Sequence, residues 1–260
     1  MMMKRQKILA TAPGLDIRLT WYQPGQSMAD HVHADHQVSW LISGDMRETS
    51  AGREHDLLRV SRGVKPAGCR HANLYGPDGA LVLALNLQPG SPFCADLPGL
   101  DDWVWAASGE DMPGEIIRIA LALSDGKISA GLALPDLAAR ITAPPRITPC
   151  RSARPPAPWL ARVREQLRDA VDDPDLAQLA ENAGVHRVHL SRSFARHYGM
   201  APSLYRLHCK LGRAMSGLMQ GASLVDAAQA GGFADQPHFT RAARRQTGLT
   251  PHRIRTLMAA

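Results

Sequence analysis

The chain has 260 residues, of which 45% are hydrophobic and 21% charged, so we expect a soluble globular protein of one large or two smaller domains. Its apolar runs are too short to span a bilayer and no apolar segment follows the basic N-terminus, so we expect a cytoplasmic location and no membrane partner. Its 4 cysteines form no CxxC pair, which argues against a disulfide framework and a ribbon-type zinc site.

The positive charge is concentrated in the last part of the chain. Residues 159–260 hold 14 of the 30 Lys and Arg but only 8 of the 24 Asp and Glu, a balance of +6 that equals the net charge of the whole chain. This imbalance favours a polyanionic partner, because phosphates attract clustered arginine. A surface that is merely solubilising is the alternative.

Residues 1–100 read mostly as short β-strands. Runs such as VSWLI, HDLLRV and ALVLALNL are separated by Gly- and Pro-rich turn signals such as GPDG at 76–79. The pattern predicts a β domain.

Three histidines fall within six positions of the stretch GQSMADHVHADHQVSWLISG at 25–44. Because residues two apart on a strand share a face, His31, His33 and Gln37 point one way and His36 the other. Inside a small barrel, the polar side chains of such a face must bind one another or a ligand, because unpaired polar groups are costly to bury. With His71 of the later segment PAGCRH, the face offers three imidazoles to Zn, Ni, Cu or Fe(II), with a weak or open fourth position.

Two other interpretations of these residues stay open. Gln37 brings no negative charge and is a poor ligand, so the same residues could line a neutral polar pocket for an organic effector. They could also be a structural remnant that binds neither. Cys69 is a candidate further ligand, whereas His36 and His55 are expected to be surface or packing residues.

Two helices and a linker are predicted next. The segment PGEIIRIALALSDGK at 113–127 has helix start and stop signals, and it is apolar nearly all round, so it must be buried. LALPDLAARI at 132–141 predicts a second helix. The pair suits a dimer interface, and burial within the chain is the alternative. PPRITPCRSARPPAP at 144–158 predicts a stiff, extended linker.

The last hundred residues contain an internal repeat. LAQLAENAGVHRVHLSRSFARHYGMAP at 176–202 aligns, with one inserted residue, with LVDAAQAGGFADQPHFTRAARRQTGLTP at 224–251. Each copy reads as a short helix, a glycine-bearing turn and a second helix, which predicts helix-turn-helix units at 176–197 and 224–246. An apolar-striped connecting helix between them can hold the second helices about 34 Å apart, the spacing of successive major grooves. A plain helical bundle is the alternative.

Through LAENAGVHRVHLSRSFARHYGMAP and AAQAGGFADQPHFTRAARRQTGLTPHRIR, residues 159–260 resemble the AraC/XylS family of bacterial transcription regulators. The resemblance implies that each second helix reads base edges near its start. The residues so implicated are Arg187, Val188, Ser191 and Arg192 in the first unit and Gln236, Pro237, Thr240 and Arg241 in the second, while Arg196, Arg244 and Arg245 are expected on phosphates. Arg192 and Arg241 can pair bidentately with guanine, and Gln236 with adenine.

Two positions depart from the pattern of that family. His186 stands where a capping Ser is common, so we expect the first reading helix to lack its usual N-cap. Ala243 stands where a Phe usually packs, so we expect the second unit to be less tightly packed.

The histidine stretch is similar to the first cupin motif, with Gln37 in place of the usual Glu, and residues 66–71 are similar to the second motif. The resemblance implies a cupin-like barrel, a sensory fold that AraC-type regulators commonly carry. Residual catalysis by such a cupin domain is the alternative function, but the sequence assigns no catalytic residue. A DNA-binding protein that acts without an effector is a third possibility.

We therefore predict an α+β chain of two domains. Residues 1–143 are expected to form a cupin-like β-barrel with a helical dimerisation edge, and residues 159–260 an all-α double helix-turn-helix domain. The predicted protein is a dimeric transcriptional regulator that binds double-stranded DNA. Its effector, a divalent metal ion such as Zn or Ni or a small organic ligand, is expected at His31, His33, Gln37 and His71, and it would change the orientation of the two domains across the linker.

Overall fold

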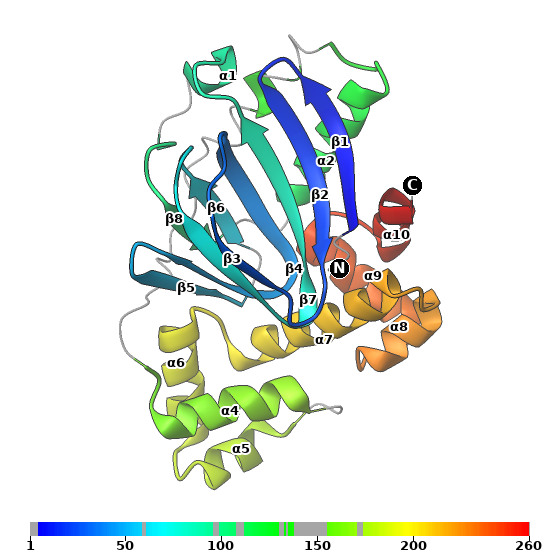
Figure 1. Cartoon of the computed structure of the whole chain (residues 1–260). Coiled ribbons are helices and arrows are strands. Elements are labelled where there is room, and N and C mark those ends of the chain that lie inside the picture. The colour runs from blue at the N-terminus through cyan, green and yellow to red at the C-terminus, as the bar shows by residue number, and fades with distance from the viewer. Residues whose placement is uncertain are drawn as a thin grey trace.

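The computed structural model describes residues 5–58, 61–95, 99–107, 112–129, 133, 135–137, 155–170 and 174–259. Most of the linker predicted at 144–158 and most of the helix predicted at 132–141 lie outside these residues. Figure 1 shows a curved sheet built from the N-terminal part of the chain and a set of helices that covers one of its sides and its lower end. The predicted α+β class, with an antiparallel N-terminal sheet and C-terminal helices, is confirmed.

The sheet has eight strands in antiparallel pairs. They are β1 (Arg5–Ala12), β2 (Leu15–Tyr22), β3 (Ser27–His31), β4 (His36–Ser50), β5 (Arg53–Leu57), β6 (Ser61–Lys65), β7 (His71–Leu87) and β8 (Val104–Ala107). The path through the sheet is β1-β2-β7-β4-β6-β8, and β3 and β5 pair with β7 and β4.

The two long strands, β4 and β7, bend the sheet around an interior. The first part of β4 pairs with β6 and its last part with β5, while the first part of β7 pairs with β3 and its last part with β2. Register shifts mark the bend, near Gly44 in β4. Gly44 has a φ of 83°, and a Cβ there would overlap the carbonyl oxygen of Gly79, so this crossing requires glycine.

The outer face of the sheet is apolar, whereas the inner face carries polar side chains beside a smaller apolar cluster that includes Met46, Val82 and Trp105. On β2, Arg18, Thr20 and Tyr22 line the interior pocket, whereas the alternate side chains Ile17 and Leu19 are fully buried on the outer side. The same alternation continues on β4 and β7. The outer face therefore forms the main hydrophobic core of the molecule together with helices that pack on it.

Nine helices are described. They are α1 (Pro92–Ala95), α2 (Met112–Ser124), α4 (Pro158–Asp169), α5 (Leu176–Asn182), α6 (Arg187–Tyr198), α7 (Pro202–Met219), α8 (Leu224–Ala230), α9 (Gln236–Thr247) and α10 (Pro251–Ala259). Helices α7–α10 share the main core with the sheet, whereas α4–α6 and the start of α7 enclose a separate core around Phe194. The two helix-turn-helix units are thus attached to the barrel in different ways.

Helix α2 is buried within the chain, which is the alternative to the dimerisation edge expected there. Ile116, Ile117 and Ala120 are fully buried and belong to the main core, where α2 packs on β1 and touches α9. The contact with α9 depends on small residues, because a Cβ on Gly114 would lie 2.6 Å from the Cα of Gly248. The apolar face of α2 is therefore occupied by its own chain.

A buried ion pair lies at the other wall of the barrel, where no charged site was expected from the sequence. Glu48 is fully buried, and the Lys65 ammonium donates to its Oε2 at 3.0 Å. Asn73 donates to the same oxygen, and the indole N–H groups of Trp103 and Trp105 donate to Oε1 at 2.6 and 2.7 Å. Burial raises the pKa of the Glu48 carboxyl, but Lys65 and the two indoles outweigh it and lower that pKa to about 2.

We predict that Glu48→Gln lowers the free energy of unfolding by roughly 3–5 kcal/mol, because it leaves the Lys65 ammonium buried without a counter-charge. Asp56→Asn is the control, since its ion pair with Arg47 is about 40% exposed on both sides and should cost less than about 1 kcal/mol. Urea unfolding at pH 7 measures both. Equal effects of the two variants would contradict the assigned role of Glu48.

The same pair predicts an acid dependence of stability. Since the Glu48 pKa falls from 4.5 in the unfolded chain to about 2 in the folded one, its contribution is complete above pH 4.5 and is lost as the pH falls toward 2. The stability difference between wild type and Glu48→Gln should therefore shrink over that interval, which unfolding curves at several pH values would measure.

Candidate effector pocket and nucleic-acid interface

The first helix-turn-helix unit is built by α5, a turn at Gly184 and α6. The Asp175 carboxylate accepts from the Ala177 amide and caps α5, and Gly184 takes a φ of 67° in the turn. Leu190 and Phe194 are fully buried, so the opposite side of α6 faces solvent. Of the residues expected to read DNA, Arg187, Val188, Arg192 and Arg196 are exposed and Ser191 is half-buried.

The expectation that α6 lacks an N-cap is wrong. The His186 backbone is extended, and its Nδ1 accepts from the amide of Val188 at 3.3 Å. A neutral imidazole with an unprotonated Nδ1 can therefore take the place of the hydroxyl that a capping Ser would supply.

The second unit repeats this construction with α8, a turn at Gly232 and α9. Ser223 caps α8, and the Asp235 carboxylate accepts from the His238 amide at 2.6 Å to cap α9. Pro237 lies in the first turn, where its missing N–H has no helical partner. The residues expected on DNA again face outward: Pro237, Arg241, Arg244 and Arg245 are exposed, and Gln236 and Thr240 are half-buried.

The loose packing expected at Ala243 is not observed. Ala243 and Phe239 are both fully buried in the main core, which α9 shares with the sheet and with α2. The small side chain of Ala243 allows α9 to pack closely against the sheet and α2.

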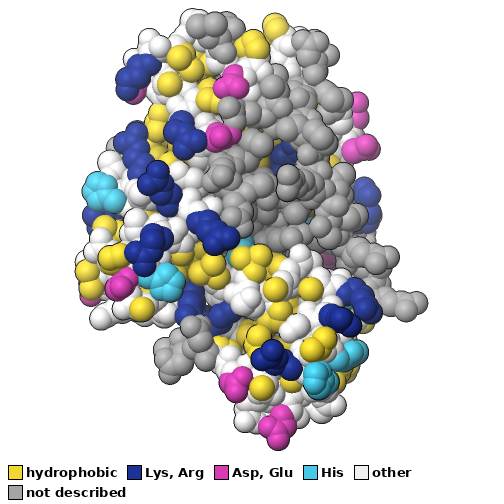
Figure 2. All heavy atoms as spheres, turned by 180° about the vertical axis from the view of Figure 1, so that it is seen from behind, with side chains coloured by type: hydrophobic (Ala, Val, Ile, Leu, Met, Phe, Trp, Pro, Cys, Tyr) yellow, Lys and Arg dark blue, Asp and Glu magenta, His cyan; other side chains and the backbone are white. Residues whose placement is uncertain are grey.

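Lys and Arg side chains lie in two groups on the face of the molecule that Figure 2 shows. Figure 2 shows Lys and Arg in one group on the side occupied by β1 and α8–α10 and in a second group near the base, where α4–α6 lie. Such a distribution supplies the electrostatic footprint of a nucleic-acid interface.

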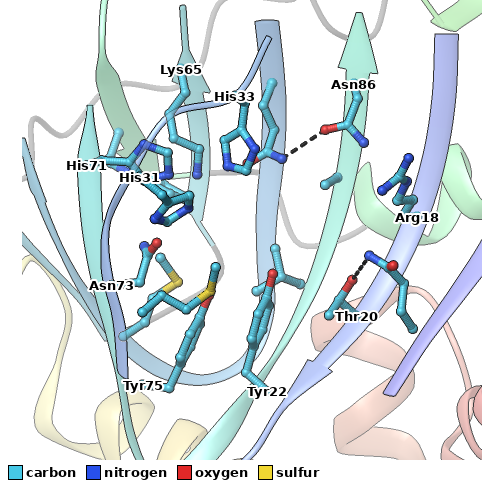
Figure 3. A pocket seen from close by; sticks show the side chains of 17 residues that line it. Arg18, Thr20, Tyr22, His31, His33, Lys65, His71, Asn73, Tyr75 and Asn86 are labelled. Atoms are coloured by element: carbon cyan, nitrogen blue, oxygen red, sulfur yellow. Dashed lines mark hydrogen bonds between the residues drawn. The ribbon is translucent and has the colours of Figure 1, made fainter. Parts of the chain in front are cut away.

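The interior pocket of the barrel brings three predicted residues together. His31 ends β3 and is the register partner of His71 at the start of β7, and His33 follows in the next loop. One ring nitrogen from each residue lies within 4.8 Å of the others, and the ring centroids are 4.3–5.1 Å apart. Figure 3 shows the three rings facing the same space.

The protonation of this cluster suits a metal ligand set. The Nδ1 atoms of His31 and His71 lie 2.8 and 3.0 Å from the carbonyl oxygens of Ala29 and Cys69. A carbonyl can only accept, so each Nδ1 carries the proton and each Nε2 keeps a free lone pair. Burial, with the neighbouring histidines and Lys65, lowers the pKa of His33 to about 4, and burial and Lys65 lower the pKa of His71.

Gln37 lines the same pocket but is held by other side chains. Its Nε2 donates to Asn86 Oδ1 at 2.9 Å, and its Oε1 accepts from Ser39 at 3.1 Å. Asn86 in turn donates to Asp16, which forms a two-point ion pair with Arg18. The amide of Gln37 therefore belongs to a polar wall beside the histidines (Figure 3).

The other residues considered from the sequence lie elsewhere. The His36 ring accepts from the Ala67 amide, and the His55 ring packs edge-on against Trp103 with centroids 4.6 Å apart. Cys69 is half-buried next to Ser50 and is not a member of the histidine group. Tyr22 and Tyr75, stacked with centroids 4.0 Å apart, close the lower end of a cavity of about 100 Å³.

No helix in the part of the chain that the structure describes is long and apolar enough to cross a membrane.

Comparison with known proteins supports the C-terminal assignment. A family model described as a helix-turn-helix domain matches residues 179–256. The chain is 35% identical over 79 residues to the HTH-type transcriptional regulator ArgR of Pseudomonas aeruginosa; the match covers 30% of this chain and 24% of that protein. The chain thus spans about a quarter of the length of this curated relative.

Solved structures give similar matches for both halves. An AraC-type DNA-binding domain protein from Chromobacterium violaceum is 31% identical, with a TM-score of 0.37, and the match covers 39% of this chain and 93% of that one. A cupin superfamily protein from Desulfitobacterium hafniense is 19% identical, with a TM-score of 0.31, and covers 33% of this chain and 78% of its own. Residues 179–256, which hold most of the two capped units, therefore match the helix-turn-helix domain family.

Proposed function

We propose that the protein is a transcriptional regulator that binds double-stranded DNA through α6 and α9 and is controlled by an effector in the barrel pocket. The observation that carries the proposal is the pair of capped helix-turn-helix units whose second helices expose arginine. Arg192 and Arg241 occupy equivalent places on the two helices, where they can reach base edges, while Arg196 and Arg245 are suited to phosphates. The cytoplasmic location and the homodimer remain predictions.

A divalent metal ion is the ligand that the three histidines of the pocket support best. His31, His33 and His71 fit such an ion, because one ring nitrogen of each converges on the same space. Burial lowers the pKa of His33 and His71, and the Nδ1 contacts of His31 and His71 with carbonyl oxygens leave Nε2 for a ligand. When bound there, the ion would be held by imidazole nitrogens, the ligands that Zn, Ni, Cu and Fe(II) share. Gln37 is assigned to the adjoining polar wall and not to the ligand set.

The effector signal is proposed to pass directly from the barrel to α7. Met46 and Tyr75 line the pocket, and their chain neighbours Asp45 and Gly76 lie beside each other at the bend of the sheet. Helix α7 packs on β4 and β7 at this bend. A Cβ on Gly212 of α7 would lie 3.4 Å from the side chain of Asp78 and 3.5 Å from the Cα of Gly44. Since α7 joins both reading units, a shift of the pocket floor would reach them without passing through the linker.

Arginines of α4 and α7 lie near acidic groups at the same bend. Burial raises the pKa of Asp45 to about 6 and also raises that of Asp78, and nearby arginines oppose both shifts: Arg168 at Asp45, and Arg213 at Asp78. Arg213 also donates to the carbonyl of Arg168 at the end of α4. The contact of the barrel with α4 and α7 is therefore partly electrostatic.

We predict that Arg192→Ala and Arg241→Ala each weaken binding to the specific DNA site by about 1–3 kcal/mol, which is roughly 5- to 150-fold in Kd, because a bidentate contact to a base is lost. The control is Arg118→Ala on α2, whose side chain is 59% exposed and lies outside both units. Fluorescence anisotropy on a selected operator measures all three. Unchanged affinity in both reading-helix variants would overturn the assigned face.

We predict that protein purified without a His-tag contains close to one metal ion per chain, and that His31→Ala and His71→Ala lose it while keeping their DNA affinity in the metal-free form. His36→Ala is the matched control, because its ring lies outside the group. Elemental analysis and anisotropy give the two readings. Equal metal content in His36→Ala and His71→Ala would refute the site.

Gly212→Leu should abolish the difference in DNA affinity between the metal-loaded and metal-free forms while leaving metal content unchanged, because the side chain has no room between α7 and the barrel. Gly212→Ala fits at van der Waals distance and should keep the response, with stability raised by up to about 1 kcal/mol. A full response in the Leu variant would show that the signal takes another route.

A further inference from the structure

The pocket carries no net negative charge with which to balance a bound cation. Among the 17 described residues that line it, none is Asp or Glu, and its two permanent cations are Arg18 and Lys65. Each is paired with one carboxylate just outside the lining: Arg18 with Asp16 at 2.6 Å, and Lys65 with Glu48 at 3.0 Å. The two pairs cancel, so the pocket is neutral before a metal ion enters.

Neither carboxylate is free to turn toward the histidines. Glu48 is fully buried, and four donors occupy its two oxygens: Lys65 and Asn73 on Oε2, and Trp103 and Trp105 on Oε1. Asp16 accepts from Arg18 through both oxygens and from Asn86 through one of them. Moving Glu48 would leave the Lys65 ammonium buried without its counter-charge, which is costly, and moving Asp16 would break its two-point ion pair with the partly exposed Arg18.

A divalent ion on three neutral imidazoles would therefore keep its full charge in a half-enclosed cavity. An uncompensated charge is strongly disfavoured there, and three protein ligands leave at least one coordination position open. Both conditions are met by an anionic ligand that enters from the cavity and completes the coordination of the metal. A metal ion alone satisfies neither condition.

The wall beside the histidines would hold the rest of such a ligand. Gln37, Asn86, Thr20 and Gln6 form two hydrogen-bonded pairs along it, and Arg18 points toward the cavity from β2 (Figure 3). These are neutral amide and hydroxyl groups with one paired guanidinium, which suit a hydroxyl, an oxo group or a second carboxylate oxygen. The cavity of about 100 Å³ restricts the ligand to a few heavy atoms.

We infer that the effector is a small hydroxy- or oxo-carboxylate that binds together with the metal ion, its carboxylate oxygen on the metal and its second polar group on the Gln37–Asn86 wall. This inference rests on the proposed metal site. It makes the metal a resident part of the sensor, and the small anion the variable signal.

The test uses full-length, untagged protein that is stripped with a chelator and reloaded with Co²⁺ in chloride-free buffer. Glycolate is the probe and glycolamide its uncharged control. Glycolate should change the Co²⁺ d–d absorption saturably and bind the loaded protein at least tenfold tighter than the metal-free protein by calorimetry, whereas glycolamide should do neither. If Co²⁺ binds but the two probes behave alike, the anion inference fails and the metal site stands. If Co²⁺ does not bind stoichiometrically, both fail.

Two variants separate charge compensation from shape. Gln37→Glu places a negative charge in the pocket, so it should keep or increase Co²⁺ affinity while weakening glycolate binding at least tenfold. Gln23→Glu makes the same change of charge at an exposed loop position and should leave both affinities unchanged. Glycolate affinity that stays at the wild-type value in Gln37→Glu would overturn the inference.

Discussion

Leucine, isoleucine and tryptophan side chains on the outer face of β2, β4 and β7 must be kept from water, and α2 together with α7–α10 covers them. This burial decides most of the architecture. Because successive side chains alternate between faces, an apolar outer face leaves polar residues pointing inward, where they form the pocket. The same burial joins the second helix-turn-helix unit to the barrel, so that sensing and reading elements share one core.

Electrostatics inside the barrel follow from pairs that cancel. Glu48 with Lys65 and Asp16 with Arg18 place four charges around the pocket without giving it a net charge. Burial and nearby positive charge, including the Lys65 ammonium, lower the pKa of His33 and His71. The charge that a bound cation needs is left for a further ligand to supply.

Local sequence patterns predicted the helix-turn-helix units and the histidine cluster. The features that the sequence did not predict depend mostly on contacts between residues far apart in the chain. The two helix-turn-helix units follow from glycine positions and helical periodicity, and the convergence of His31, His33 and His71 follows from the motif spacing, although His33 lies in the loop after β3 and not on one strand with Gln37. The network around Glu48 joins residues up to 57 positions apart, so no local pattern shows it. The N-cap of α6 was not predicted because the His186 imidazole takes the place of the usual hydroxyl. The apolar pattern of α2 predicts that the helix is buried, but it does not show whether its own chain or a second copy covers it. In the structure, contacts with α9 help to cover it.

The shared core has a consequence for how the chain can fold during synthesis. The strands of the sheet are complete only at Ala107, and much of the apolar layer that covers them comes from residues between 211 and 257. An emerging chain must therefore hold a large apolar surface uncovered until its final helices leave the ribosome, a situation in which chaperones are commonly needed. For the same reason, a fragment that ends at the linker would expose this surface, and it would be a poor substitute for the intact protein.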